Sequence, residues 1–158
     1  LHKEYRRQRQ MCIRDRAKLY FEDITEGDPL PPYTVTAGYM ELNRFASANN
    51  EFVPIHMDPE FSKEQARLPD PIVMGNLKIA YIGNALSSWI GDDGWVRKIT
   101  VEYRRMDTVN STLTATGYVR EKRREQGENL VELDVWVEND KGEKSTPGQA
   151  TVVLPGKD

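Results

Sequence analysis

Two side chains that can exchange protons lie close together in the first third of the chain. Glu51 and His56 are five residues apart, in a stretch from Asn49 to Pro71 that contains four prolines. A carboxylate and an imidazole on such an irregular loop can hold one water molecule between them and act as general base and general acid. Long irregular segments in compact domains are usually functional or disordered. Glu51 and His56 are therefore the candidate catalytic pair.

His56 also has a structural alternative, because a lone histidine beside prolines is more often a satisfied structural residue than a catalyst. Two features favour chemistry, namely the spacing from Glu51 and the apolar segment that follows the loop. For Asp58 two roles are open: it could orient the imidazole of His56, or it could begin the turn at Pro59.

A long helix must position this pair. Between residues 72 and 90 apolar side chains surround a helical wheel almost completely, and such a helix must be buried on nearly all faces. Within it we expect Lys78 to extend its ammonium group to solvent and Asn84 to be a core amide with satisfied hydrogen bonds, rather than pocket residues.

Shorter patterns predict the elements on either side of the loop and helix. Upstream, residues 33 to 35 are a strand candidate, Thr36 can cap a helix, and residues 38 to 48 have the spacing of a short amphipathic helix. Downstream of Gly94, apolar and polar residues alternate, which is typical of an antiparallel sheet with one apolar face. Its first apolar residues are Ile99, Val101 and Tyr103.

Polar hairpins are expected at Gln126-Gly127 and at residues 140 to 142. One apolar helix followed by a long meander predicts an α+β hot-dog fold, in which an antiparallel β-sheet wraps around one long central buried helix. A doubly wound α/β fold would need helices alternating with strands. A curled sheet leaves an edge strand unpaired, and pairing with a second copy would protect it, so we expect a homodimer.

Composition limits the class of protein. With 158 residues, 38% apolar and 30% charged, the chain is expected to form one globular domain and not a disordered one. One cysteine excludes an internal disulfide framework, and two widely spaced histidines cannot build an ordinary zinc site. We expect no metal and no cofactor. Because no segment is apolar enough to cross a bilayer or act as a signal peptide, we expect a cytoplasmic protein that does not bind membranes.

The N-terminal segment differs from the rest in charge. Residues 1 to 18 hold seven Lys/Arg against two Asp/Glu, which leaves fifteen against twenty-three elsewhere. The run from Met11 to Arg16 resembles translated sequencing-adapter DNA. We therefore predict a non-native or disordered basic tail over residues 1–16, a single domain over residues 17–158, and no nucleic-acid partner. Deletion of the tail should leave melting temperature and activity unchanged.

The segment from Ser47 to Asp58, together with Pro71 to Gly75, resembles the hydratase signature of the MaoC-like family of (R)-specific enoyl-CoA hydratases. In that signature an acidic residue stands five positions before the histidine of an Asn-Pro-[apolar]-His-x-Asp core. The resemblance extends from about residue 20 to residue 155. It places Glu51 on the family's catalytic aspartate, His56 on its catalytic histidine, and Gly75 on the glycine that opens the buried helix.

The resemblance implies hydration of trans-2-enoyl thioesters to 3-hydroxyacyl thioesters, or the reverse dehydration, on an acyl-CoA or acyl-carrier-protein substrate. Glu51 and His56 would be catalytic, and the N–H of Gly75 would donate to the thioester oxygen. The other substrate-binding residues would be Asn76, Val53 and Met74.

Three positions depart from the family pattern, since Glu51, Val53 and Met74 stand where aspartate, asparagine and histidine are common. We interpret them as differences of a subgroup. They also favour an alternative, a non-catalytic acyl-binding subunit of a hydratase heterodimer, and a hot-dog acyl-thioesterase is a further alternative. Arg104-Arg105 could meet the phosphates of coenzyme A or form a solvated strand end.

Overall fold

The computed structural model of the protein describes residues 18–157. The prediction of a basic tail over residues 1–16 lies outside the described residues. The helices are η1 (Phe21–Asp23), α2 (Tyr39–Asn49), η2 (Pro54–His56), α3 (Pro59–Glu64) and α4 (Gly75–Ile90). The strands are β1 (Pro29–Thr36), β2 (Trp95–Val101), β3 (Thr112–Glu125), β4 (Glu128–Asn139) and β5 (Lys144–Leu154).

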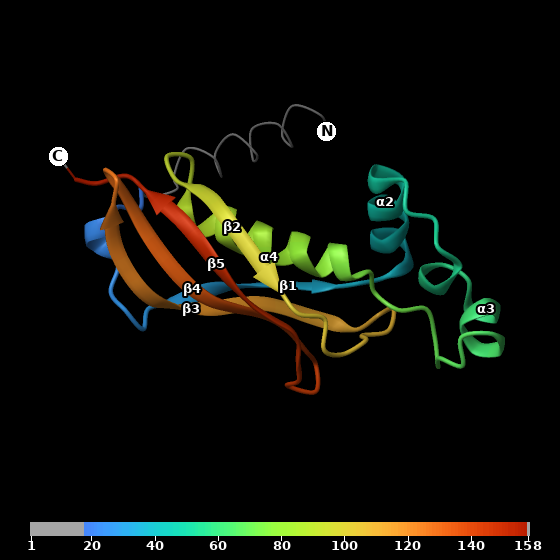
Figure 1. Ribbon diagram of the computed structural model, residues 1–158. Helices are drawn as coiled ribbons and strands as arrows, with labels where there is room; N and C mark the ends of the chain where they lie inside the picture. Colours follow the sequence, from blue (N-terminus) through green and yellow to red (C-terminus); the bar gives the residue numbers. More distant parts are fainter. Residues whose placement is uncertain (1–17, 158) are drawn as a thin grey trace, which may run out of the picture.

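The five strands form one antiparallel sheet in the order β1-β3-β4-β5-β2. Helix α4 lies along one face of this curved sheet (Figure 1), and their facing side chains form the core. Strand β3 shows the expected period of two, because Leu113, Ala115 and Val119 are buried. The predicted α+β hot-dog architecture is confirmed.

The predicted hairpin between β3 and β4 is also confirmed. Gln126 and Gly127 both have positive φ angles, of 52° and 83°, and they join the paired residues Glu125 and Glu128. Two successive positive φ angles define the type I′ turn, whose twist matches that of the flanking strands. The second hairpin, from Asn139 to Lys144, lies where the sequence predicts it.

Helix α4 is buried on one face only in this chain, so the prediction of burial on nearly all faces is wrong. Tyr81, Ile82 and Leu86 face the sheet and are at most 2% exposed, whereas Trp89 is half-buried. The helix is less buried than predicted because the sheet covers only one of its sides. Asn84 lies on the exposed side, where its amide donates to the Tyr33 hydroxyl over 3.4 Å, and it is therefore not a core amide.

The first strand is longer than expected. β1 begins at Pro29, and its pairing with β3 shifts register between Leu30 and Tyr33. Because β1 is an edge strand, its prolines remove no ladder hydrogen bond from the interior of the sheet. Thr36 is the last residue of β1 and not a helix cap; α2 starts after Gly38. The predicted amphipathic helix itself is confirmed, with a shift of one residue.

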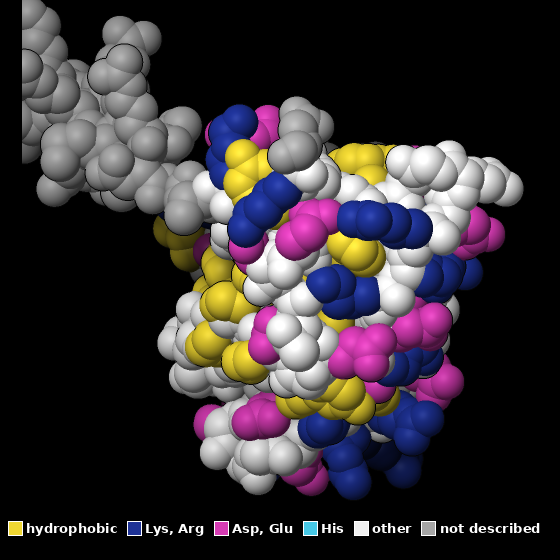
Figure 2. All heavy atoms as spheres, turned by 90° about the vertical axis from the view of Figure 1, so that its left-hand side faces the viewer, with side chains coloured by type: hydrophobic (Ala, Val, Ile, Leu, Met, Phe, Trp, Pro, Cys, Tyr) yellow, Lys and Arg dark blue, Asp and Glu magenta, His cyan; other side chains and the backbone are white. Residues whose placement is uncertain are grey.

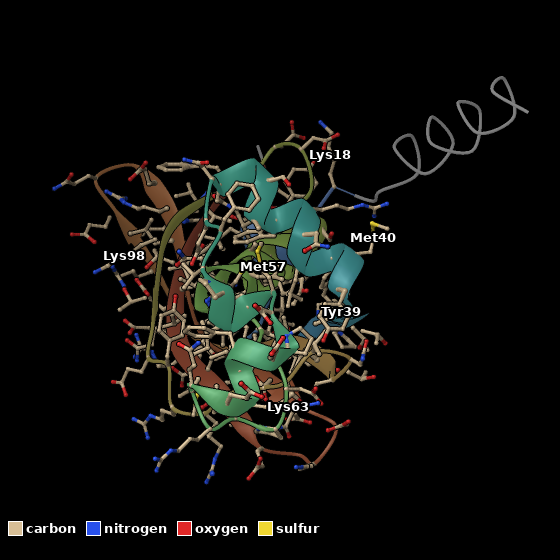
Figure 3. The ribbon with its side chains drawn as sticks, turned by 90° about the vertical axis from the view of Figure 1, so that its right-hand side faces the viewer. Lys18, Tyr39, Met40, Met57, Lys63 and Lys98 are labelled. Atoms are coloured by element: carbon tan, nitrogen blue, oxygen red, sulfur yellow. The ribbon has the colours of Figure 1, made fainter. Side chains whose placement is uncertain are left out.

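The segment between α2 and α4 covers one end of the sheet. Figure 3 shows α2 and α3 in front of that end, with Met57 between them, and Met57 packs partly buried against the core. The predicted irregular loop thus contains two short helical turns, η2 and α3.

The opposite end of the molecule, around η1 and the β3-β4 hairpin, has a mixed charge. In Figure 2 dark blue and magenta side chains are interspersed over most of that face. Ion pairs account for part of this pattern, including Arg124 with Glu22 at 2.6 Å and Lys157 with Asp23. Charges of both signs therefore share this face.

Candidate active site

Glu51 follows directly after helix α2. Asn50 ends the helix in the left-handed conformation with φ 53°, a conformation that asparagine tolerates well. The N–H of Glu51 then donates to the carbonyl oxygen of Ala46 over 3.0 Å. This helix end holds the backbone of Glu51 at the start of the loop.

His56 is the last residue of the helical turn η2. Pro54 starts this turn, and the N–H of His56 donates to the carbonyl oxygen of Val53 over 3.0 Å. The imidazole Nδ1 lies 2.8 Å from the carbonyl oxygen of Ile72. Because a carbonyl only accepts, Nδ1 must carry the proton, and in the neutral ring the lone pair is on Nε2. The contact with Ile72 orients the ring toward the start of α4.

Gly75 is the first residue of α4, so its N–H has no acceptor within the helix. The residue before it, Met74, supplies no capping hydrogen bond from its side chain. The start of α4 therefore presents a backbone donor, supported by the positive end of the helix dipole. Such a donor can stabilise negative charge on a ligand.

One pocket of about 280 Å³ brings these groups together. Its lining residues are Glu51, His56, Ile72, Val73, Gly75, Asn76, Lys78, Tyr103, Arg105 and Met106. The loop, the start of α4 and the segment after β2 each supply one wall. A carboxylate, an imidazole and a free backbone N–H in one pocket can carry out proton transfer next to a stabilised oxyanion.

Two predicted substrate-binding residues do not line this pocket. The side chain of Met74 is fully buried in the core, and that of Val53 is 45% exposed. Asp58 takes the second of its two possible roles, because its carboxylate accepts from the N–H groups of Glu60 and Phe61 and caps α3. The ring of His56 is instead oriented by the backbone of Ile72.

Lys78 is buried and ion-paired, so the prediction of a solvent-reaching lysine is wrong. Its ammonium group donates to the carbonyl oxygen of Arg105 and to the carboxylate of Asp107, both over 2.9 Å, and to the Ser145 hydroxyl over 3.5 Å. Asn139 donates to the second oxygen of Asp107 over 3.1 Å. This network ties α4 to the segment that forms a wall of the pocket.

Sequence reasoning missed Tyr103 and Met106 as pocket residues. The alternation after Gly94 continues formally to Tyr103, but β2 ends at Val101, and beyond it the chain keeps only a few backbone hydrogen bonds to β5. The pair Arg104-Arg105, which breaks the apolar pattern, is a local signal of this strand end. The two arginines separate: Arg105 borders the pocket, whereas Arg104 pairs with Glu102 at 2.7 Å.

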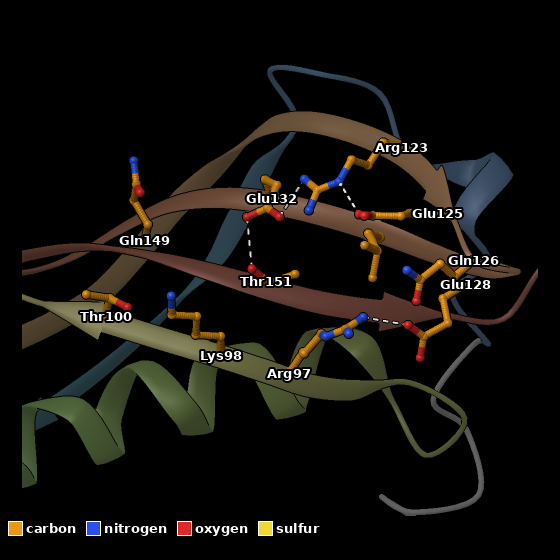
Figure 4. Close-up of a pocket in the computed structure, with 11 residues that line it drawn as sticks. Arg97, Lys98, Thr100, Arg123, Glu125, Gln126, Glu128, Glu132, Gln149 and Thr151 are labelled. Carbon is orange, nitrogen blue, oxygen red and sulfur yellow. Dashed lines mark hydrogen bonds and ion pairs between the residues drawn. The ribbon is translucent and has the colours of Figure 1, made fainter.

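A larger groove of about 540 Å³ lies on the face of the sheet turned away from α4 (Figure 4). All of its charged side chains except Lys98 bond to one another. Arg123 binds Glu132 over 2.7 Å and Glu125 over 3.1 Å, while Arg97 binds Glu128. Neither member of the candidate catalytic pair reaches this groove, and we do not assign the active site to it.

Within residues 18–157, no group of three or more His, Cys, Asp or Glu side chains is arranged to hold a metal ion. None of the helices in this part of the chain is long and apolar enough to cross a membrane.

The family of the chain follows from a comparison with known domains. Residues 21–141 match the family model described as the MaoC like domain. This match covers well over half of the chain, and the chain therefore belongs to the MaoC-like family, as the motif around His56 predicted. A search of curated proteins found no match.

Solved structures share the fold at low sequence identity. An (R)-hydratase from A. caviae involved in PHA biosynthesis is 23% identical, with a TM-score of 0.78, over 85% of this chain and 99% of its own. An (R)-hydratase from Pseudomonas aeruginosa is 20% identical, with a TM-score of 0.80, and the match covers 89% of this chain and 88% of the hydratase chain. A chain of the ChsH1–ChsH2 complex from Mycobacterium tuberculosis is 17% identical, with a TM-score of 0.72, and the match covers 82% of this chain and 98% of that one.

Proposed function

We propose that the protein is a hydro-lyase that adds water to trans-2-enoyl thioesters and removes it from 3-hydroxyacyl thioesters. The observation that carries the proposal is the meeting of Glu51, His56 and Gly75 in one pocket. Membership of the MaoC-like family supports it. We further propose that coenzyme A or acyl carrier protein carries the acyl group and that the enzyme acts in the cytoplasm.

Each group has a part in this reaction. Glu51 takes a proton from water while the water oxygen bonds to C3 of the enoyl group, and the Nε2–H of protonated His56 delivers a proton to C2. The Gly75 N–H stabilises the charge that develops on the thioester oxygen. Transfer of the proton from Glu51 to Nε2 then restores both groups. Throughout, the carbonyl oxygen of Ile72 holds Nδ1–H and keeps the ring in place.

Hydration of crotonyl-CoA, followed by the loss of absorbance of the conjugated thioester, tests the proposal. We expect turnover by the wild type, and a loss of about 10²- to 10⁴-fold in Glu51→Gln, because the amide cannot accept the proton. Release of free thiol during turnover would instead identify a thioesterase. Binding of the thioester without hydration until a partner chain is added would identify an acyl-binding subunit of a heterodimer.

We also propose that the enzyme is a homodimer. Among the residues that the structure describes, strand β2 has a neighbour, β5, on one side only, and Trp95 on this edge strand is 50% exposed. The side of α4 that the sheet leaves uncovered includes half-buried Ile79 and Trp89. A second copy would pair with the edge and cover these apolar groups. Sedimentation of the purified chain should give twice its own mass, and a monomer would contradict this assembly.

A further inference from the structure

Tyr103 is a pocket residue for which the proposed reaction has no role so far. It comes two residues after the end of β2, and its side chain is 54% exposed. A large aromatic side chain that is half open to solvent beside Glu51 and His56 contributes little to the core. Its position therefore calls for a role in the pocket.

The backbone around Tyr103 is firmly held. The N–H of Glu102 donates to the carbonyl oxygen of Pro147 over 2.9 Å. The N–H of Arg104 donates to the carbonyl oxygen of Ser145 over 3.0 Å. One residue further, the carbonyl oxygen of Arg105 accepts from the buried ammonium group of Lys78. The main chain thus places Tyr103 in a defined position, although its ring is exposed.

The hydroxyl end of the ring lies against the start of α4. A Cβ atom added to Gly75 would be 2.6 Å from Cζ of Tyr103 and 2.8 Å from Cε1, so only glycine leaves room for the ring here. The hydroxyl donates to Oδ1 of Asn76 over 3.3 Å. The phenol oxygen and the free N–H of Gly75 therefore lie at the same helix terminus.

The phenol is available as a donor at neutral pH. Burial, and then the negative charge of Glu51, raise the pKa of Tyr103 above its ordinary value. Its bond to Asn76 is long for a hydroxyl donor, whose usual distance is about 2.7–2.8 Å. A weak bond of this kind is readily exchanged for one to a ligand oxygen that acquires negative charge.

We propose that Tyr103 is a second hydrogen-bond donor to the thioester carbonyl oxygen, beside the N–H of Gly75. This inference rests on the proposed hydration in the same pocket. On substrate binding the hydroxyl turns from Asn76 to the thioester oxygen, and its bond strengthens as charge moves from C2 to that oxygen. Stabilisation that grows in the transition state raises kcat more than it lowers KM.

The test compares Tyr103→Phe with Tyr118→Phe in crotonyl-CoA hydration. Tyr118 is a matched control, since it is 41% exposed and its hydroxyl also donates to a side chain, Asp134, over 2.8 Å, but it lies on the outer face of the sheet. We expect Tyr103→Phe to lower kcat by about 10- to 100-fold, at or below the usual effect of removing one oxyanion donor. KM should change by less than about twofold. Tyr118→Phe should keep wild-type kcat, and both variants should keep the wild-type melting temperature.

Two outcomes would overturn the inference alone. Full kcat in Tyr103→Phe, with an active wild type and an inactive His56→Ala, would show that the ring acts without its hydroxyl. A rise in KM at unchanged kcat would show that Tyr103 binds substrate and transition state equally. A wild type without hydration activity would overturn the proposed function, and this inference with it.

Discussion

Two grooves of the molecule, the one beside Glu51 and His56 and the one lined by Arg123 and Glu132, differ in what their polar groups bind. In the larger one, on the outer face of the sheet, arginine and glutamate side chains form ion pairs with one another, as Arg123 and Glu132 do at 2.7 Å (Figure 4). In the smaller one, at the start of α4, no hydrogen bond or ion pair within residues 18–157 engages the carboxylate of Glu51, and the Gly75 N–H has no acceptor in its helix.

On the proposed assignment, the site with unpaired groups is the smaller groove, so groove size is not what marks it. Strand surfaces present alternate side chains that neutralise their neighbours. A loop and a helix terminus, by contrast, leave backbone and side-chain groups free to bind a ligand. If this comparison is right, substitutions in the small pocket affect activity or stability strongly, and substitutions in the large groove do so weakly.

The largest expected effect is on activity. His56→Ala should lower kcat/KM for enoyl thioester hydration by about 10³-fold, because it removes a general acid and base. The control is Lys98→Ala in the outer groove, where hydration should stay within about twofold of wild type. Steady-state kinetics measures both. Equal losses in the two variants would abolish the contrast between the grooves.

The second effect is on stability. Lys78→Met should lower the free energy of unfolding by about 3–5 kcal/mol, because Asp107 would stay buried without its cation. Lys98→Met makes the same change at an exposed site and should alter the free energy of unfolding by at most about 0.5 kcal/mol. Urea titration gives both values. A cost below about 1 kcal/mol at Lys78 would mean that the pair contributes no more than a surface ion pair.

A third variant tests the close contact at the helix terminus. In Gly75→Ala the new methyl group would overlap the ring of Tyr103 at 2.6 Å, so the ring must move and kcat/KM should fall by about 10- to 100-fold. Gly38→Ala at the start of α2 is the control, because its Cβ would meet only Oδ1 of Asn110, at an ordinary 3.6 Å. Unchanged hydration by Gly75→Ala would show that the reaction does not depend on the position of the Tyr103 ring against Gly75.

The smallest effect is expected at an outer ion pair. Arg97→Ala removes the pairing with Glu128, and both side chains are more than one-third exposed. The free energy of unfolding should fall by at most about 1 kcal/mol, and less in high salt. Thermal unfolding at two salt concentrations measures this. A large loss that persists in salt would show that the outer groove is more than a solvated strand surface.

Local patterns predicted most of the fold, with errors where an element's surroundings mattered. The period of two in β3 and the Gln126-Gly127 turn depend on near neighbours, and both predictions are confirmed. The length of β1 was underestimated because its prolines are acceptable only on an edge strand, and strand order is not a local property.

In the candidate site, too, some features could be predicted from the sequence and others needed the coordinates. The spacing of Glu51 and His56, and their nearness along the chain to Gly75, are properties of the amino-acid sequence, and they were enough to name a candidate catalytic pair and to predict the family, which the family match confirms. The role of Asp58 needed coordinates, because either of its alternatives satisfies the same spacing.

By itself, then, the sequence determined which segments are apolar, where they turn, and which acid and base share a loop. Only the tertiary structure decided that Lys78 is buried against Asp107, 29 residues away, and that Tyr103 lies on Gly75. The physical reason is that periodicity reports which face of an element is apolar, whereas burial and hydrogen bonding depend on which distant element covers that face.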